Sequence, residues 1–397
     1  MGKSLCSKKN VWIAKKMKIS EFNLSYCLNA FDFSGDWKMS LNRVDSIFSK
    51  VREKSLISSK EMLGLGFWTS SNFLKLMQCD ENIGYLQNFL KSRNYFISTV
   101  NAFPYGVFHN QPVKDKVYLP NWLNEKRVEF TIKAAVFLQK FLPENGIGSI
   151  STLPGAYKLH IKSSDHKIMK QIADNLEKVA EYLAYIYEAT GKKIRLGVEM
   201  EPDCIWETPE EFVGFYNNYL SAFKYAPEYI GVCYDTCHQE LIESTPGAGL
   251  RIFLNNDIPI VKIQLSAALE IQNIEFFKNI KNFDEHVYLH QTRIFNNHGE
   301  ISEKFIDIPC LKTMSEEDAI LKCHFHLPIF WDEKGKFFAS ARKELLKTLD
   351  FLKKNPNICQ DIEIETYTYN VLPDCINNND ITSAVVNEYK WVMKCLM

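Results

Sequence analysis

Two stretches decide the fold: residues 196–202, Leu-Gly-Val-Glu-Met-Glu-Pro, and residues 234–238, Tyr-Asp-Thr-Cys-His. They close two apolar, β-rich runs at residues 194–200 and 229–234. Runs of this length and composition suit buried strands. Glu199 stands at the end of the first run, and Asp235 follows the second. We therefore expect residues 194–239 to carry the metal-binding half of a strand–helix barrel.

Strand-like and helix-like segments alternate along the rest of the chain. Strands are expected at residues 23–31, 62–68, 95–100, 148–153, 194–200, 229–234, 259–265 and 362–367. Helices are expected at 72–93 with a break near Asp80, and at 128–142, 166–190, 208–219, 249–256 and 343–352. The clearest helix is 166–190, because its apolar residues recur every three or four positions. Gly191 suits the position that ends such a helix.

Eight strand–helix units predict an α/β fold, a closed (β/α)8 TIM barrel. The turns lack the Gly-x-Gly-x-x-Gly pattern of dinucleotide-binding folds. About 95 residues separate the seventh and eighth strands, so we expect a long insertion on the barrel rim. Five of the nine histidines lie in it: His286, His290, His298, His324 and His326. We expect residues 1–17 to be a disordered extension, with Met17 as an alternative start, and residues 18–397 to form one domain.

Composition narrows the class of protein. The 397 residues carry 47 Lys and Arg against 48 Asp and Glu, a formal net charge of -1. This balance argues against a nucleic-acid partner, which would favour a basic surface. The 11 cysteines form no Cys-x-x-Cys pair, so we expect reduced thiols and a cytoplasmic protein. No apolar run is long enough to span a bilayer, and the N-terminal segment lacks the apolar stretch of a signal peptide.

Three carboxylates are expected at the carboxyl ends of the strands, where barrel enzymes place their sites. Glu199, Asp235 and Glu365 follow the fifth, sixth and eighth strands, and Gln264 ends the seventh. A carboxylate inside a barrel is costly unless it is paired or binds a metal. These four residues and His238 therefore predict a site for Mn²⁺, Mg²⁺ or Zn²⁺. The alternative is that the acids are salt-bridged structural groups.

Histidines supply the other polar groups near this site. His238 either binds the metal or a substrate hydroxyl, or it caps the following helix. His324 and His326 flank Phe325 in a segment that suits a strand, so both side chains would lie on one face. For these two, and for His290, contact with a metal or substrate competes with a structural role. Cys237 is expected to be a packed thiol.

A second cluster follows the third strand: Asn101-Ala102-Phe103-Pro104-Tyr105-Gly106-Val107-Phe108-His109. Aromatic residues with proline and glycine on a loop at the barrel top suit the wall of a binding pocket. We expect Asn101, Tyr105 and His109 to contact substrate, with Tyr118 and Trp122 completing the wall. Packing in the core is the alternative. Ser149, Ser151 and Thr152, which end the fourth strand, are further candidates for a polar ligand.

The motifs together resemble a known family. The supporting segments are residues 26–29 (YCLN), 101–106 (NAFPYG), 148–154 (GSISTLP), 199–202 (EMEP), 231–239 (GVCYDTCHQ), 262–266 (KIQLS), 288–291 (YLHQ), 324–330 (HFHLPIF) and 363–367 (EIETY). They are similar to the xylose-isomerase-like barrel superfamily, which includes sugar isomerases, epimerases and endonuclease IV-type repair enzymes. More closely, the chain resembles the EboE family of metabolite traffic proteins.

The resemblance implies a partner and a site. It implies a barrel encoded beside a prenyltransferase-like membrane protein, moving a small-molecule precursor toward the periplasm. Glu199, Asp235 and Glu365 match metal-binding positions of the superfamily, and His238 matches a metal or substrate position. Gln264 departs from the pattern, because the epimerases and the endonuclease have histidine there. Asn29 and Asn101 stand near the strand ends where the endonuclease has further histidines.

Three functions follow as hypotheses. The first is a metal-dependent isomerase, epimerase or lyase-type enzyme, in which Glu199 and Glu365 bind metal, one of them exchanges a proton beside a carbonyl, and His238 contacts a hydroxyl. The second is a metabolite-binding or delivery protein without turnover, which the departure at Gln264 favours. The third and most distant is a DNA-repair nuclease.

Overall fold

The computed structural model describes residues 18–19, 22–55, 57, 61–109, 111–161, 165–272, 277–311, 320–331, 338–373 and 380–396. The extension expected at residues 1–17 lies outside the described residues. All cysteines within the described ranges are free thiols, as the spacing predicts. None of the helices described there is long and apolar enough to cross a bilayer.

Eight parallel strands close into the expected barrel. They are β2 (Phe22–Cys27), β3 (Leu63–Trp68), β4 (Tyr95–Phe96) continued by β5 (Thr99–Asn101), β6 (Ile147–Thr152), β7 (Lys193–Glu199), β8 (Ile230–Asp235), β9 (Ile260–Leu265) and β15 (Asp361–Ile364). The last strand pairs with both β9 and β2, and β2 pairs with β3, which completes the circle. A short β1 (Lys18–Ile19) pairs antiparallel with β2.

Three strands differ from the expected bounds. The first ends at Cys27, because residues 28–30 turn into a 3-10 helix. The third is interrupted after Phe96, and the eighth ends at Ile364. Apolar composition alone does not mark these ends, because buried turns are as apolar as the strands beside them.

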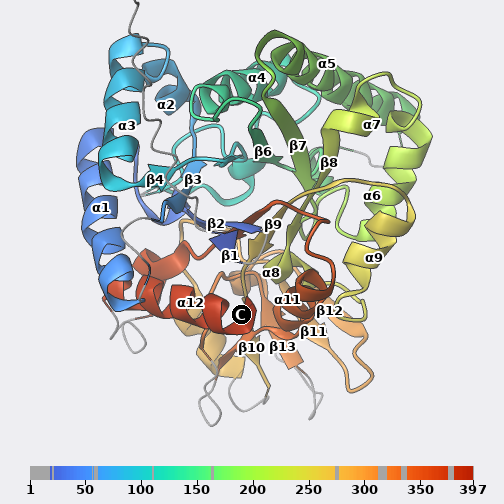
Figure 1. The fold of residues 1–397 in the computed structure, drawn as a ribbon. Coiled ribbons are helices and arrows are strands. Elements are labelled where there is room, and N and C mark those ends of the chain that lie inside the picture. The colour runs from blue at the N-terminus through green and yellow to red at the C-terminus, as the bar shows by residue number, and fades with distance from the viewer. Residues whose placement is uncertain are drawn as a thin grey trace, which may run out of the picture.

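Helices surround the barrel (Figure 1). The longer ones are α1 (Trp37–Lys54), α3 (Asp80–Arg93), α4 (Glu125–Gln139), α5 (His166–Thr190), α9 (Ala248–Asn255), α11 (Lys343–Lys354) and α12 (Ile381–Leu396). The shorter ones are α2 (Ser71–Leu76), α6 (Pro209–Phe215), α7 (Ala226–Tyr229) and α8 (Thr236–Gln239). The break before Asp80 and both ends of α5 are as predicted. Gly191 has φ +67, as the end of α5 requires.

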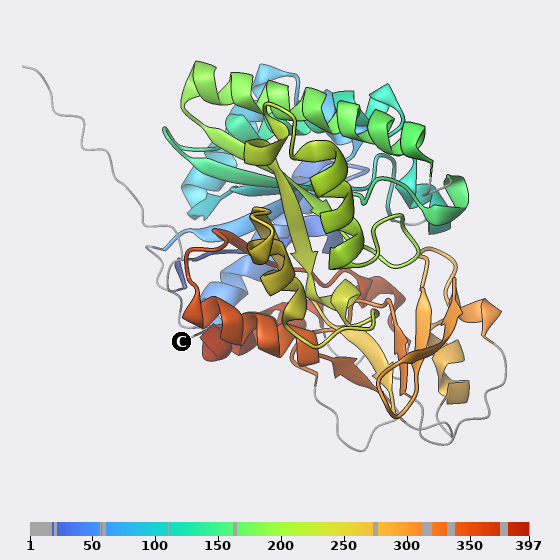
Figure 2. The ribbon, with the colours of Figure 1, turned by 90° about the vertical axis from the view of Figure 1, so that its right-hand side faces the viewer.

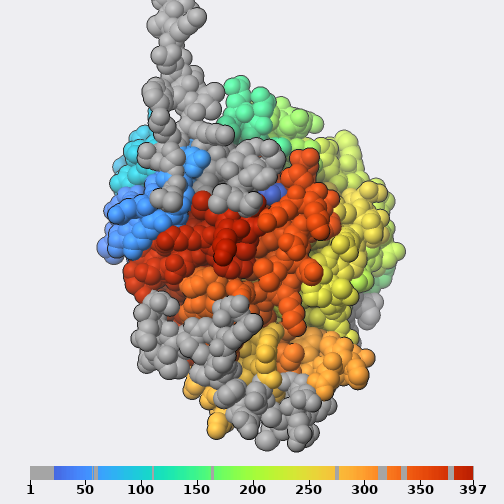
Figure 3. Space-filling model, turned by 60° about the horizontal axis from the view of Figure 1, so that its bottom comes forward, coloured from blue at the N-terminus to red at the C-terminus, as the bar shows by residue number. Residues whose placement is uncertain are grey.

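Capping explains where several helices begin. Thr208 forms a capping box with Glu211 at the start of α6. Asp36 accepts hydrogen bonds from the first backbone amides of α1, a helix that was not predicted from the sequence. The helix α12 was not predicted either. That helix packs between α1 and α11 (Figure 3), so it completes the ring of helices at the last strand.

The insertion folds into its own antiparallel sheet beside the barrel (Figure 2). The strands are β10 (Ala268–Ile271), β11 (Thr292–Phe295), β12 (Ile301–Phe305), β13 (Ile320–Cys323) and β14 (Ala339–Ala341), in the order β12-β11-β13-β10-β14. The segment around residues 324–326 was expected to be a strand, which is wrong, because β13 ends at Cys323. The chain then leaves the sheet and crosses toward the barrel, where the Leu327 amide bonds the Ala267 carbonyl.

Charged residues in the barrel interior toward the amino ends of β9 and β15, which we call the lower end of the barrel, are compensated by other side chains. Lys262 and Glu363 are fully buried, with 2.5 Å between Nζ and Oε2. The hydroxyls of Ser98 and Ser149 donate to Asp361 at 2.8 and 2.9 Å. Of the three β6 residues expected to contact a polar ligand, Ser149, Ser151 and Thr152, two bond protein groups instead. Ser149 bonds Asp361, and Ser151 accepts from Lys262 at 3.3 Å.

Candidate metal centre

A cavity opens at the carboxyl ends of the barrel strands. Its polar lining is Asn29, Asn101, Lys114, Tyr118, Glu199, Glu201, His238, His324, His326 and Glu365. Its apolar lining includes Trp68, Phe103, Phe108, Tyr288 and Tyr367. The polar lining contains residues from the barrel and from the insertion, so the site is shared between these two parts of the chain.

The three carboxylates predicted from the strand ends do converge. Glu199, Asp235 and Glu365 each offer an oxygen atom, and these atoms lie within 4.8 Å of one another. All three side chains are buried. We call these three residues the carboxylate group. Their convergence follows from the parallel register, since β8 pairs with β9, and β9 with β15.

In two of these carboxylates, Glu365 and Asp235, neighbouring donors form hydrogen bonds to only one of the two oxygens. Glu365 Oε1 accepts from Asn29 Nδ2 at 2.6 Å and from Asn101 Nδ2 at 3.3 Å. Asp235 Oδ1 accepts from Ser266 Oγ at 2.6 Å and from the Cys237 amide at 2.7 Å. The second oxygens, Glu365 Oε2 and Asp235 Oδ2, are buried and accept no hydrogen bond from any described residue.

Burial and mutual repulsion act on the same acids. Burial raises the pKa of Glu199 well above its usual range, and the charges of Glu365 and Asp235 raise it further. Burial also raises the pKa of Glu365, with Asp235 as the next cause. Lys262 lowers both pKa values but is already paired with Glu363. The carboxylate group therefore favours binding of a cation.

Three histidine rings face one another beside the carboxylate group. His324 Nε2 lies 3.1 Å from His238 Nε2 and 3.2 Å from His326 Nε2. All three side chains are buried. We call these residues the histidine group. Asp235 caps α8 through the amides of Cys237 and His238, so capping by His238, the alternative left open by the sequence, is not its role.

The hydrogen bonds made by the Nδ1 atoms determine which nitrogen of each ring carries the proton. His238 Nδ1 lies 2.9 Å from the Met200 carbonyl, and His326 Nδ1 lies 3.2 Å from the Glu365 carbonyl. A carbonyl oxygen only accepts, so both Nδ1 atoms carry the proton. His324 Nδ1 lies 2.7 Å from Gln291 Oε1. In a neutral ring each Nε2 then bears a lone pair, and burial lowers the pKa of His326 to about 4, which keeps it neutral.

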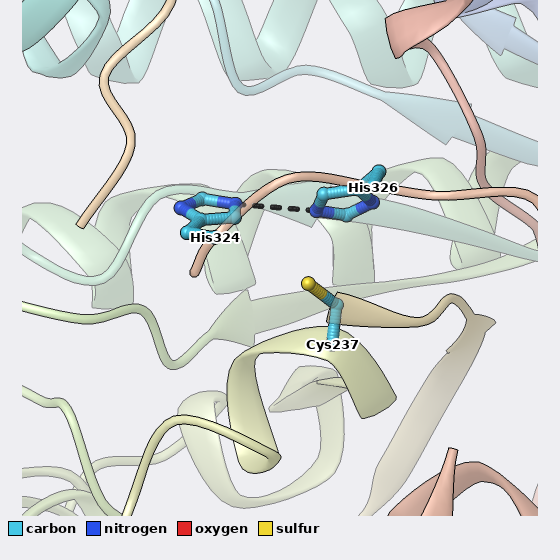
Figure 4. A group of neighbouring side chains, drawn as sticks. All are labelled: Cys237, His324 and His326. Atoms are coloured by element: carbon cyan, nitrogen blue, oxygen red, sulfur yellow. Dashed lines mark hydrogen bonds between the residues drawn. The ribbon is translucent and has the colours of Figure 1, made fainter. Parts of the chain in front are cut away.

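Cys237 adds a sulfur atom near two of these rings. Its Sγ and ligand nitrogens of His324 and His326 lie within 4.8 Å of one another, with the thiol directed toward the two rings (Figure 4). Burial raises the pKa of Cys237 well above its usual value, so the free thiol stays protonated. This agrees with the expectation of a packed thiol rather than a nucleophile.

Glu201 lines the cavity, although no role was predicted for it from the sequence. Its Oε1 accepts from the Tyr118 hydroxyl at 2.8 Å, and its buried Oε2 accepts nothing from the described residues. Burial raises its pKa to about 7. The signal was present in the sequence, because Glu201 follows Glu199 by two positions and so shares its face.

Several predicted contacts lie away from the cavity lining. Tyr105 packs on Phe130, with 5.2 Å between the ring centroids. His109 Nδ1 lies 2.8 Å from the hydroxyl of Tyr288, so it supports a residue of the cavity wall. Trp122 is buried in the core, where it bonds the Leu153 carbonyl. Asn101, His324 and His326 do line the cavity.

His290 and Gln264 also lie behind the lining. His290 bonds Glu285 through Nε2 and the His324 carbonyl through Nδ1, both at 2.8 Å. It therefore holds the backbone of the histidine group. Gln264 is fully buried, and its Oε1 accepts from the Cys233 thiol at 3.0 Å. Its proposed contact with metal or substrate stays a prediction.

No protein-family model and no curated protein matches the sequence. The chain is similar to a xylose isomerase-like TIM barrel protein from Mycobacterium smegmatis in complex with magnesium, with a TM-score of 0.52 and 10% identity over 96% of this chain and 98% of that chain. The fold is that of a xylose-isomerase-like TIM barrel.

Two further solved structures are similar at lower scores. D-Psicose 3-epimerase from Clostridium cellulolyticum H10 gives a TM-score of 0.48 and 11% identity, over 93% of this chain and 99% of that chain. A xylose isomerase domain protein from Alicyclobacillus acidocaldarius gives 0.48 and 8% identity, over 94% and 99%.

Proposed function

We propose that this chain is a metal-dependent enzyme that moves a proton beside a carbonyl of a small polar molecule, in an isomerase, epimerase or lyase-type reaction. The observation that carries the proposal is the carboxylate group. Three buried acids converge there, and two of them have an oxygen without a donor. A divalent cation would offset the cost of burying these charges.

The residues present fit such an ion. Glu199, Asp235 and Glu365 would hold it, and oxygen donors of this kind suit Mg²⁺ or Mn²⁺. When bound, the ion would polarise a carbonyl or orient a diol of the substrate. The similar barrel from Mycobacterium smegmatis was solved with magnesium, which agrees with this choice.

The chain's own side chains have separable tasks. Asn29 and Asn101 hold one oxygen of Glu365, so that the other faces the site. Glu201 is the proton-transfer candidate, because it lines the cavity and its Oε2 accepts no hydrogen bond from the described residues. The hydroxyl of Tyr118 donates to Glu201 and so holds it in place. The aromatic wall around Trp68 would exclude water from the reacting atoms.

Gln264 favours a second candidate. Its amide oxygen accepts from the Cys233 thiol, so a metal bound by Gln264 would have to share that oxygen. A weaker metal site suits a metabolite traffic protein of the EboE type, which would bind a precursor and deliver it for export toward the periplasm. The membrane prenyltransferase-like protein would then be its partner.

An isotope-exchange experiment separates the two candidates. The protein, loaded with Mg²⁺ or Mn²⁺ in deuterated water, would be incubated with a panel of ketoses and hydroxyketones. We expect deuterium to enter the carbon beside the carbonyl of at least one compound, detected by mass spectrometry. Glu201→Gln should lower the rate by about 10²-fold or more, as loss of general acid–base catalysis does.

The matched control is Glu344→Gln. Glu344 is also a buried acid, but it bonds Tyr234 and the Gly247 amide outside the cavity. This control should exchange deuterium at the rate of the unmodified protein. Absence of exchange with every compound at saturating metal would contradict the enzyme and leave the delivery protein.

A further inference from the structure

We propose that Glu388, a buried acid of α12, is a positioning residue that fixes Glu365 in the carboxylate group. The inference rests on the proposed function, because the place of Glu365 matters for metal binding only where the carboxylate group holds an ion. Glu388 lies outside the cavity lining, so it would act through its protein contacts and not by touching the ion. The contact that matters most is with Thr366, the residue that directly follows Glu365.

Glu388 is fully buried, and its carboxylate accepts four hydrogen bonds. The hydroxyls of Tyr26 and Tyr369 both donate to Oε2, each at 2.7 Å. The Thr366 hydroxyl donates to Oε1 at 2.7 Å, and the Ile329 amide donates to the same oxygen at 3.2 Å. Burying a carboxylate costs free energy unless donors of this kind replace its water. The donors come from separate parts of the chain, so one side chain of α12 holds these parts together.

The bond from Thr366 supports Glu365 at the point where the barrel sheet ends. The strand β15 ends at Ile364, so Glu365 is the first residue beyond it. The Glu365 amide still donates to the Leu265 carbonyl of β9 at 3.1 Å. The next residue is held by the bond from its hydroxyl to Glu388. The backbone at Glu365 is therefore held by β9 on one side and by α12 on the other.

Two further segments that contact Glu365 are bonded to the same acid. Tyr26 lies on β2, which leads to Asn29, and the side-chain amide of Asn29 donates to Glu365 Oε1 at 2.6 Å. Ile329 follows His326, whose Nδ1 donates to the Glu365 carbonyl at 3.2 Å. The acid of α12 therefore fixes the segments that carry both of these donors.

This arrangement bears on metal binding through the second oxygen of Glu365. Asn29 and Asn101 hold Oε1, and Oε2 accepts no hydrogen bond from the described residues. The position of Oε2 therefore depends on the position of the backbone that carries it. Groups behind a metal ligand orient that ligand, and removing one lowers metal affinity about 10–100-fold. We expect the loss of the Thr366 bond alone to lie at the lower limit, because the other bonds to Glu388 stay.

Titration with Mn²⁺ tests this role. Protein stripped with a chelator would be titrated with Mn²⁺, and the free ion would be measured by electron paramagnetic resonance. We expect Thr366→Val to bind Mn²⁺ about 10-fold more weakly than the unmodified chain. Thr366→Ser keeps the hydroxyl and should bind Mn²⁺ as the unmodified chain does.

The matched control is Thr348→Val. Thr348 is an equally buried threonine that donates to another buried acid, Glu344, at 3.2 Å, and neither residue lines the cavity. This control should lose a similar amount of stability and no affinity for Mn²⁺. Equal Mn²⁺ affinity in Thr366→Val and Thr348→Val would overturn the positioning role.

Circular dichroism would check that each variant folds. If Thr366→Val does not fold, Tyr369→Phe takes its place, because it removes a single donor from the other oxygen of Glu388. It should weaken Mn²⁺ binding in the same direction, and an unchanged affinity would also overturn the role.

Hydrogen exchange separates this inference from the proposed function. Measured by mass spectrometry in the presence of a chelator, backbone exchange around residues 326–329 and 364–369 should be faster in Thr366→Val and unchanged in Thr348→Val. Faster local exchange together with no Mn²⁺ binding by the unmodified chain would remove the metal-dependent enzyme and keep the link from Glu388 to Glu365. Unchanged exchange in both segments of Thr366→Val would overturn that link, whatever the unmodified chain binds.

Discussion

The two ends of the barrel interior treat buried charge in opposite ways. At the lower end, Lys262 neutralises Glu363, and serine hydroxyls bond Asp361. At the upper end, no Lys or Arg side chain among the described residues pairs with the carboxylate group or with Glu201. Buried oxygens without a hydrogen bond from the described residues occur at both ends, on Asp235, Glu365 and Glu201 above and on Glu363 below, so the presence of the cation is what differs. Both ends are equally buried, so exposure to solvent does not explain the difference.

This contrast indicates which end serves stability and which serves function. Burying an acid without a partner costs free energy. At the lower end, which no ion or ligand enters, side chains of the protein supply that partner permanently. At the mouth of the barrel, the missing partners leave room for ions and a ligand.

The largest effect should come from Lys262→Met. The change leaves Glu363 buried without its cation, so we expect the free energy of unfolding to fall by about 3–5 kcal/mol. Denaturant unfolding monitored by fluorescence would measure it. The double variant Lys262→Met with Glu363→Leu should recover much of the loss. No recovery in the double variant would show that the pair is not the source.

Gly66→Ala should have the next largest effect. A Cβ at Gly66 would lie 1.3 Å from Glu363 Oε1, so the carboxylate would have to leave its place beside Lys262. We expect a loss of about 1–3 kcal/mol, as for other overpacked interiors. Gly84→Ala in α3 is the matched control, since its Cβ would meet nothing within 4 Å. That control should gain about 1 kcal/mol from helix propensity.

Ser149→Ala probes the lower end more gently. It removes one of the hydroxyls that bond Asp361 and leaves the Ser98 bond in place. We expect a loss of about 1.5 kcal/mol, the usual contribution of a hydrogen bond to a charged group. A thermal melt at fixed pH would record it. An unchanged melting temperature would mean that Asp361 is compensated by other groups.

The smallest effect should be a gain in the free energy of unfolding and not a loss. Glu365→Gln removes one negative charge from the upper end and keeps an oxygen for the Asn29 amide. In the presence of a chelator we expect the free energy of unfolding to rise by about 1 kcal/mol, as when a functional site is relieved of repulsion. With metal added, the unmodified chain should be the more stable one, because ion binding stabilises the folded state. A loss of stability in chelator would contradict our view of this end.

Much of this fold was predictable from sequence because its signals are local. The period of α5, the break before Asp80 and the capping residues of α6 all act within a few positions. The acids at the strand ends were predictable for a related reason. Parallel strands place their carboxyl ends at one rim, so Glu199, Asp235 and Glu365 converge once the barrel closes.

The rest of the site required contacts between distant segments. His324 and His326 reach His238 only because the insertion folds into a separate sheet, and the chain then leaves β13 toward the barrel. Tyr105 and His109 looked like cavity residues, yet packing turned them toward Phe130 and Tyr288. No periodic pattern encodes such choices, since they depend on which surfaces fit together.

The barrel and the convergence of its acids are thus encoded locally, because strand period and parallel pairing fix which side chains share a rim. Which polar groups stay without partners depends on the folded chain. The amide oxygen of Gln264 accepts a hydrogen bond from Cys233, while one oxygen of Asp235 and one of Glu365 accept none from the described residues. The physical reason is that hydrogen-bond partners in the interior are assigned by three-dimensional packing across the barrel, between residues that lie far apart in the chain.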